Sequence, residues 1–232
     1  MSTILLRLDA PLQSWGVHSR FGRRDTGTEP SKSGIVGLLA AALGLARDAD
    51  ISELAALTMA VRCDREGQVE RDYHTAGDVP QVNGGRRTIV SERHYLADAC
   101  FLVAMEGKPE TVLKAAAGLT SPVFPLFLGR KAFAAPPDLL IGVTEASALE
   151  AVRTHSWLEQ RAEAVRQARQ EAENDMPRML RVVHDDQPGP DTHLRYDHPL
   201  SFARDNRQFA PRHVRTDFIP LTGELLKTSS QE

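Results

Sequence analysis

The chain has 232 residues and a mass of 25.5 kDa, enough for one elaborated domain or two small ones. Its apolar fraction of 41% and charged fraction of 25% are typical of globular proteins and exclude a largely disordered chain. Two cysteines, Cys63 and Cys100, are too few for a disulfide framework, and no apolar run is long enough for a signal peptide or a bilayer span. We therefore expect a cytoplasmic protein without a membrane partner.

Apolar patterns predict the strands and helices of the first half of the chain. The first strand is apolar on both faces, which is typical of a central position in a sheet. The predicted strands cover residues 3–8, 59–63, 68–74, 88–95 and 97–105, and the predicted helices cover residues 33–45, 52–57 and 109–117. A turn at 65–67 predicts a hairpin of 59–63 with 68–74, whereas the glycines and prolines of residues 75–87 indicate a stretch without regular structure.

The second half is less regular. A strand at residues 139–144 precedes one long helix at 147–173, and strands near 179–183 and 213–219 flank a Pro-Gly-Pro break. The order strand, helix, strand, strand, helix, strand is that of ferredoxin-like folds, the class that includes the RNA-recognition motif. We expect an α+β protein with a palm at residues 1–119, which includes an excursion at about 75–93. A looser β-rich extension, residues 120–232, is expected to pack on the palm.

Basic residues are unevenly placed, although the formal net charge is −3. Of the 28 basic residues, 23 are arginine, whose planar guanidinium suits phosphate contact and base stacking. Basic residues outnumber acidic ones in residues 10–32, 124–136 and 202–215, whereas residues 145–175 are rich in glutamate. This arrangement favours one local site for a polyanion on an otherwise acidic protein.

Two short motifs have alternative interpretations. Ser33 and Gly34 open the predicted buried helix, where free backbone N–H groups can bind an anion. Alternatively, the helix is simply capped and Gly34 serves packing. Trp15, in the first basic loop, provides either an exposed surface for base stacking or a core side chain.

Histidines suggest two kinds of catalytic chemistry. His74 and His94 each adjoin a tyrosine and fit acid–base cleavage of RNA at the 2′-hydroxyl, or they simply pack at strand ends. His and Asp side chains from His184 to His198 suggest a metal-dependent phosphohydrolase. They span the Pro-Gly-Pro loop without helical spacing, so we expect no metal and no cofactor.

Several short blocks, in order along the chain, resemble the CasD family, the type I-E Cascade members of the RAMP superfamily of CRISPR-associated proteins. The blocks are APLQSWG at 10–16, PSKSG at 30–34, AVRCD at 60–64, RDYHT at 71–75, YLADACF at 95–101, LGRK at 128–131 and RQFA at 207–210. The sequence departs from the family pattern in two places: the excursion at 76–92 is short, and residues 147–190 contain no matching motif.

The resemblance implies a non-enzymatic protein with a palm and a thumb, in which the thumb is a β-hairpin that protrudes from the palm. Family members hold the 5′ handle of the CRISPR RNA, cap the backbone filament of CasC subunits and contact the large subunit CasA, in antiviral defence. They reach target DNA only through the complex. In type I-C systems the homologous subunit cuts the repeat RNA, so the alternative function is a metal-independent endoribonuclease.

The basic segments and the resemblance coincide, and together they indicate the residues that bind RNA. The expected RNA-binding residues are Gln13, Ser14, Trp15, Arg20, Arg24, Lys32, Ser33, Gly34, His74, Arg86, Arg87, Arg93, Arg130, Lys131, Arg207 and Arg212. Stacking on exposed bases and neutralisation of phosphates are the interactions expected with single-stranded RNA. No catalytic residue is expected.

Overall fold

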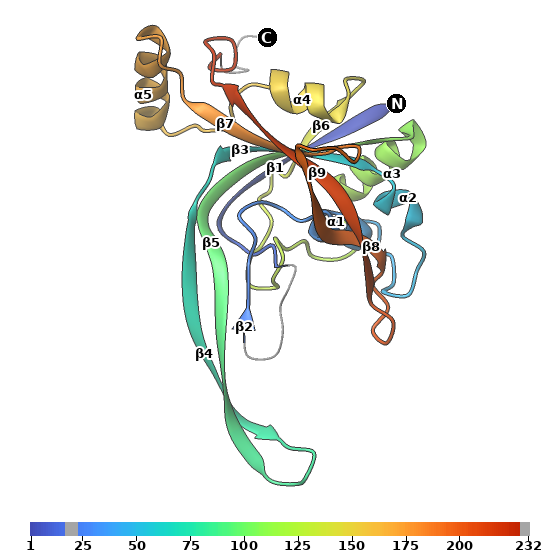
Figure 1. Cartoon of the computed structure of the whole chain (residues 1–232). Helices are drawn as coiled ribbons and strands as arrows, with labels where there is room; N and C mark the ends of the chain where they lie inside the picture. Colours follow the sequence, from blue (N-terminus) through green and yellow to red (C-terminus); the bar gives the residue numbers. More distant parts are fainter. Residues whose placement is uncertain (17–22, 228–232) are drawn as a thin grey trace.

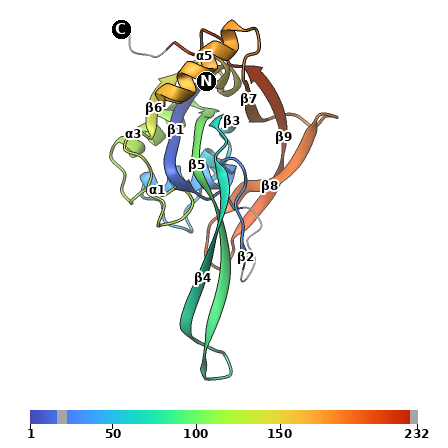
Figure 2. The ribbon, with the colours of Figure 1, turned by 90° about the vertical axis from the view of Figure 1, so that its left-hand side faces the viewer.

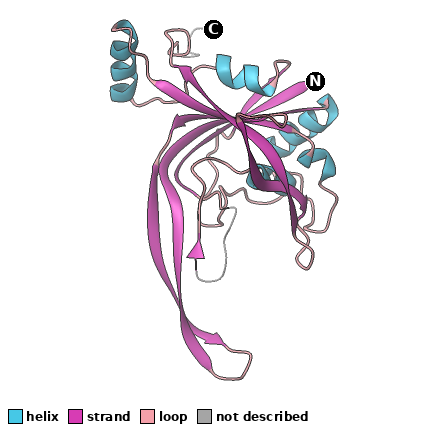
Figure 3. Ribbon diagram, in the orientation of Figure 1, coloured by secondary structure: helices cyan, strands magenta, loops and turns pink. Residues whose placement is uncertain are grey.

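The computed structural model describes residues 1–16 and 23–227, and in these residues nine strands form one sheet flanked by five helices (Figures 1 and 3). The strand order is β6-β1-β5-β3-β7-β9-β8, and β2 and β4 both pair with β5 outside this path. The first four strands are β6 (Leu140–Thr144), β1 (Ser2–Gln13), β5 (Arg86–Gly107) and β3 (Thr58–Arg65), all antiparallel to their neighbours. Strand β1 lies between β5 and β6, which confirms its predicted central position.

Helices cover both faces of this sheet. On one face lie α1 (Lys32–Ala42), α2 (Ser52–Ala55) and α3 (Pro109–Thr120), which enclose the larger apolar core with Ile4, Leu39 and Phe101. On the other face α4 (Ala148–Thr154) packs on Leu102 and Val182. Because α4 and the segment after it cover that second face, it is not an open platform for bases, unlike the sheet face of an RNA-recognition motif.

A long hairpin projects from the sheet (Figures 1 and 2). It consists of β4 (Gln68–Pro80) and the first half of β5, paired from Gln68 with Ala97 to Pro80 with Arg86. The predicted hairpin of 59–63 with 68–74 is therefore wrong, as is the division of β5 into two strands. The irregular stretch predicted at 75–87 is confined to the turn at 81–85. Asp78 and Asp98 have positive φ, so local distortions at these residues let the strands continue where the sequence indicates breaks.

The predicted single helix at 147–173 is two helices, α4 and α5 (Ala162–Glu173). The buried Arg62 side chain separates them, because its guanidinium donates hydrogen bonds to the carbonyls of Val152 at 2.8 Å and His155 at 2.6 Å. These carbonyls would otherwise accept bonds from the next helical turn. Arg62 also forms a bidentate ion pair with Asp64, at 2.6 and 2.8 Å, and both side chains are fully buried.

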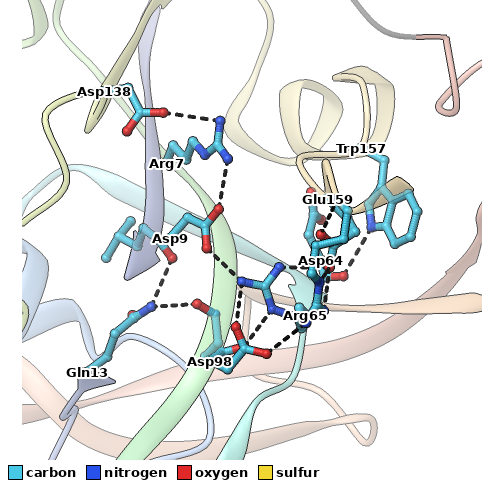
Figure 4. Close-up of polar contacts among 12 residues, drawn as sticks. Arg7, Asp9, Gln13, Asp64, Arg65, Asp98, Asp138, Trp157 and Glu159 are labelled. Carbon is cyan, nitrogen blue, oxygen red and sulfur yellow. Dashed lines mark hydrogen bonds and ion pairs between the residues drawn. The ribbon is translucent and has the colours of Figure 1, made fainter. Parts of the chain in front are cut away.

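A second set of charged contacts fastens the segment after α4 to the sheet (Figure 4). Asp9 on β1 accepts from Arg7 at 2.8 Å and from Arg65 at 2.7 Å, and Arg65 reaches Glu159 at 2.7 Å. A segment without regular structure is thus positioned by side-chain ion pairs from two strands of the sheet.

The C-terminal part continues the same sheet. Strand β7 (Met179–Asp185) pairs with β3, and β9 (Gln208–Pro220) lies between β7 and the edge strand β8 (Thr192–Ser201). The sequence analysis missed β8, which contains Pro199 and a register shift between Arg195 and His198. Within residues 1–16 and 23–227, no helix is long and apolar enough to cross a membrane.

Candidate nucleic-acid interface

A polar hollow of about 630 Å³ opens at the foot of the hairpin. Its walls come from the loop after β1, strand β2 (Arg23–Arg24), the start of α1, the turn before β6 and the segment between β8 and β9. We call it the arginine hollow. Seven of the sixteen expected residues line it: Ser14, Trp15, Arg24, Ser33, Gly34, Arg130 and Arg207. The fold therefore brings together three basic segments that are far apart in the sequence.

A tight turn presents Arg130 at this hollow. Leu128 is fully buried below the turn, and its N–H donates to the carbonyl of Phe133 at 2.7 Å. Gly129 has a φ of +90°, and a Cβ at this position would lie 1.7 Å from the carbonyl oxygen of Ser14. The backbones of this turn and of the loop after β1 can approach so closely only because residue 129 is glycine.

Arg24, Arg93 and Arg130 form a cluster of positive charge. Arg130 donates to the carbonyl of His94 at 2.7 Å and to that of Arg24 at 3.3 Å. Strand β2 runs parallel to β5, and the backbone of Arg24 lies beside that of Arg93 in this pairing. Partial burial, followed by the charges of Arg93 and Arg24, lowers the pKa of Arg130, and the negative charge of Asp72, opposite Arg93 on the hairpin, opposes this only in part.

Nothing in the described part of the chain neutralises this cluster by direct contact: none of the three guanidiniums lies within 4.0 Å of a carboxylate there. The Nε atom of Arg93 is also sealed from water without a hydrogen-bond partner among the described residues. Repulsion between the guanidiniums favours binding of an anion.

Exposed cations extend the cluster. The Arg207 guanidinium lies over the ring of Phe209, 5.1 Å from its centroid, at the edge of the arginine hollow. Lys131 is exposed next to Arg130. Arg20 lies outside the described residues.

Two expected contacts are corrected because their side chains are in the core. Trp15 is 1% exposed, and its Nε1 donates to Oε1 of Gln13 at 3.1 Å. Gln13 is fully buried and donates to the carbonyls of Leu8 and Ala99. Neither side chain is a stacking surface. Gly34 serves packing, since a Cβ there would lie 2.9 Å from Cε3 of Trp15.

Two more expected contacts, Lys32 and Arg212, are held in a buried ion network. Lys32 Nζ lies 3.0 Å from Asp185, and Arg212 contacts both Asp185 and Asp197. The backbone N–H of Lys32 donates to Asp197 at 2.8 Å, so a carboxylate of this chain already occupies the start of α1. Although burial raises the pKa of Asp197, Arg212 and the Lys32 N–H bring it below its usual value. We therefore withdraw these two residues from the RNA contacts.

The hairpin carries the remaining expected residues. Arg87 is exposed near the tip, and Arg86 pairs with Asp78 across the two strands. Gly84 and Gly85 at the tip have positive φ and open space around them, which is consistent with the projection seen in Figure 1.

The two histidines considered for RNA cleavage lie on opposite faces of the hairpin. His74 is opposite Ser91, and His94 is opposite Arg71, three residues from His74 along β4. Side chains alternate between faces along a strand, so these two cannot flank one phosphate as acid and base. Among the described residues, no three His, Cys, Asp or Glu side chains are placed to hold a metal ion. His184, one of the candidates, instead contacts Asp217.

Sequence reasoning missed several residues that line the site. Tyr196 borders the arginine hollow from β8, and Asp25 borders it from the residue after β2. No sequence signal was available for Tyr196, because β8 itself was not predicted. Asp25 is one of the two acidic residues in the basic segment 10–32, and the sequence gives no sign of a binding role for it.

The fold and the site define a class: mixed α/β proteins that can bind a flexible polyanion in a cationic hollow below a projecting hairpin. The chain belongs to the family described as "CRISPR-associated protein (Cas_Cas5)", whose model it matches over residues 3–215. It is similar to the CRISPR system Cascade subunit CasD of Escherichia coli (strain K12), with 37% identity over 164 residues, 63% of this chain and 73% of that protein.

Solved structures agree with this assignment. A chain of a CRISPR RNA-guided surveillance complex superposes with a TM-score of 0.82 and 32% identity, over 99% of this chain and 95% of that one. A Cas protein crystal structure superposes with a TM-score of 0.71 and 38% identity, over 94% and 95% of the two chains. The resemblance inferred from the sequence blocks is thereby confirmed.

Proposed function

We propose that this chain is a non-catalytic RNA-binding subunit of a type I-E CRISPR Cascade surveillance complex. It holds the 5′ handle of the CRISPR RNA and caps the backbone filament for antiviral defence. The observation that carries the proposal is the cluster of Arg24, Arg93 and Arg130 at the foot of the hairpin, which forms no ion pair among the described residues, in a chain similar to CasD. Single-stranded RNA supplies the phosphates that such a cluster needs.

The proposal also divides the chain into two structural parts. We take residues 1–119, with the hairpin as thumb, as a ferredoxin-like palm and residues 120–232 as an extension packed on it. The order β6-β1-β5-β3, with α1 and α3 on one face, supports the ferredoxin-like interpretation. The fourth strand of this order, β6 at Leu140–Thr144, comes after residue 119, so the extension contributes one strand to the palm. Because α4 covers the other face, the RNA is expected at the loops below the sheet.

The partners are inferred from the same relationship. They are the handle of the CRISPR RNA, the backbone subunit CasC and the large subunit CasA in the cytoplasm, with target DNA reached only through the complex. An enzymatic role is not proposed. The alternative, a metal-independent endoribonuclease, needs an acid and a base at one phosphate, and the opposite facing of His74 and His94 disfavours it.

The test is the binding of labelled handle RNA to the full chain at several salt concentrations. Arg24→Glu is the first variant, because the Arg24 side chain is exposed and its contact with Arg130 uses only its carbonyl. We expect weaker binding and a shallower salt dependence, by roughly 0.7 in log–log slope for each phosphate that the protein no longer neutralises. Arg169→Glu on α5 makes the same charge change on an exposed residue away from the site and serves as the control.

The outcomes are distinct. An equal loss of RNA affinity in Arg24→Glu and in the control Arg169→Glu would contradict a local phosphate site. RNA binding that is insensitive to salt would contradict it as well. RNA recovered intact after incubation supports the non-catalytic role, whereas a metal-independent cut removed by His74→Ala would favour the endoribonuclease.

A further inference from the structure

A second hollow, of about 580 Å³, adjoins the arginine hollow. Trp15, Asp25, Ser31 and Tyr196 line both, so the two spaces share one wall. The second hollow lies between the foot of the hairpin, the 23–31 loop and strand β8. We call it the carboxylate hollow, because three carboxylates line it: Asp25, Glu29 and Asp197.

A phosphate is disfavoured in the carboxylate hollow. The two arginines that line it are already paired, Arg23 with Asp25 at 2.8 Å and Arg195 with Glu29. The neighbouring hollows therefore differ in charge. The arginine hollow has guanidiniums without ion pairs, whereas the carboxylate hollow has carboxylates and guanidiniums that are already paired with carboxylates. A nucleotide that spans them would place its phosphate in the arginine hollow and its base in the carboxylate hollow.

The side walls of the carboxylate hollow suit an unstacked base. Val69 on the hairpin and Leu194 and Tyr196 on β8 are 56%, 50% and 53% exposed, which is high for large apolar side chains. An aromatic ring with aliphatic neighbours is the usual surface on which a single base stacks.

Asp25 keeps acceptor capacity in this hollow: Arg23 donates to its Oδ1 at 2.8 Å, and none of the described residues donates to its Oδ2. Asp25 Oδ1 is 3.6 Å from Nδ1 of His94, too long for a hydrogen bond, and that nitrogen is buried without a hydrogen-bond partner in the part of the chain that is described. Strand alternation points His94 and Arg93 to opposite faces of β5, and His94 is the one of the two that lines the carboxylate hollow. A base edge that donates to Asp25 would use the remaining acceptor capacity of this carboxylate.

We infer that the carboxylate hollow selects one unstacked RNA base that bears an amino group, with Asp25 as the specificity-determining acceptor and Tyr196 as the stacking wall. Adenine, cytosine and guanine each present an exocyclic amino donor to a carboxylate. Uracil presents one imide N–H between two carbonyl oxygens, which the carboxylate repels. The inference rests on the proposed RNA-binding function and adds a base preference to it.

The experiment measures fluorescence anisotropy of the full chain with eight-nucleotide oligoadenylate, oligocytidylate and oligouridylate. We expect the first two to bind about tenfold more tightly than oligouridylate. Asp25→Asn should abolish most of this preference, because an amide can also donate to uracil O4. Asp175→Asn removes the same charge from an exposed residue remote from both hollows and should retain the preference. The ratio of affinities within each protein removes the general effect of charge.

A second variant tests the stacking wall independently. Tyr196→Ala removes a half-exposed ring and is expected to weaken oligoadenylate binding by about tenfold. Phe218→Ala, at a ring 61% exposed on β9, is the matched control. Equal affinities for the three oligonucleotides in the unmodified protein, or a preference unchanged by Asp25→Asn, would overturn the inference and leave the proposed function standing. Binding of none of the three would overturn both.

Discussion

The arginines of this chain fall into two groups that differ in their partners. Arg62, Arg65 and Arg212 each contact carboxylates within the fold, and Arg62 and Arg212 are almost completely buried. Arg130 instead donates to backbone carbonyls, and neither Arg130 nor Arg24 has a close carboxylate in the described residues. A buried charge needs a partner to remain stable, whereas an unpaired cluster is available to a ligand. The proposed RNA binding therefore uses the second group.

Glu159 provides a pH test of the first group. Burial raises its pKa, but hydrogen bonds from Arg161 and Arg65 outweigh burial and lower it to about 2 from a usual value of 4.5. The ionised carboxylate thus stabilises the native state fully above about pH 4.5, and this stabilisation is lost as the pH falls towards 2. Glu159→Gln should cost about 1–3 kcal/mol at pH 7, and the difference from the unmodified protein should narrow below pH 4.5.

Urea unfolding at pH 7, 4 and 2.5 measures this effect, with Glu53→Gln on the exposed side of α2 as the control. A difference that stays constant over the whole pH range would show that Glu159 has no coupled partners in the native state.

At individual residues, the sequence predicted the basic character of the site better than the role of each side chain. Arg130, Arg24 and Arg207 were predicted because few acids lie near them in the sequence, and the fold does gather them. Arg212 was included on the same ground, but its partners Asp185 and Asp197 come from other strands. Local charge counts cannot detect a partner that only tertiary structure brings close.

At the scale of elements, the hairpin is the feature that distinguishes the molecule. The sequence predicts that its first strand ends near residue 75, because Gly77, Asp78 and Pro80 are typical of turns. The cross-strand pairing nevertheless continues to the pair of Pro80 with Arg86. A register shift between Ala76 and Val79 accommodates Gly77 and Asp78. Pairing between strands can override local turn propensity, and a single sequence does not reveal that pairing.

The outer part of the hairpin can be removed without loss of the fold. Replacing residues 76–89 with a four-residue Gly-Ser turn deletes exposed or half-exposed side chains and leaves the foot with Arg93 intact. We expect the melting temperature to change by less than about 2 °C, since little buried surface is removed. Handle RNA should still bind the isolated chain through the arginine cluster.

Assembly is expected to depend on the removed part. Co-expression with the other Cascade subunits and a guide RNA should give an incomplete complex if the projecting strands bend the RNA or contact a neighbour. A complete complex that binds target DNA normally would show that the outer hairpin is not a thumb.

At the scale of the whole molecule, one sheet connects the two parts that we distinguish as palm and extension. Strand β7 pairs directly with β3 of the palm, and Asp185 at its end accepts from the N–H of Met59 at 2.9 Å. Asp185 also contacts Lys32 at the start of α1 and Arg212 on β9. The boundary at residue 119 therefore lies within a continuous hydrogen-bonded structure. We expect the chain to unfold as one cooperative unit.

Calorimetry of the full chain tests this expectation. One transition should appear, with equal calorimetric and van't Hoff enthalpies. Asp185→Ala should shift the whole transition downwards by roughly 10 °C, because it leaves Lys32 and Arg212 buried without a shared partner, at a cost of about 3–5 kcal/mol. Asp175→Asn, at an exposed residue with a φ of 58° that asparagine adopts readily, should leave the transition in place. Two resolved transitions, of which Asp185→Ala moves only one, would instead mean that palm and extension fold separately. The arginine hollow, whose walls come from both, would then depend on their docking.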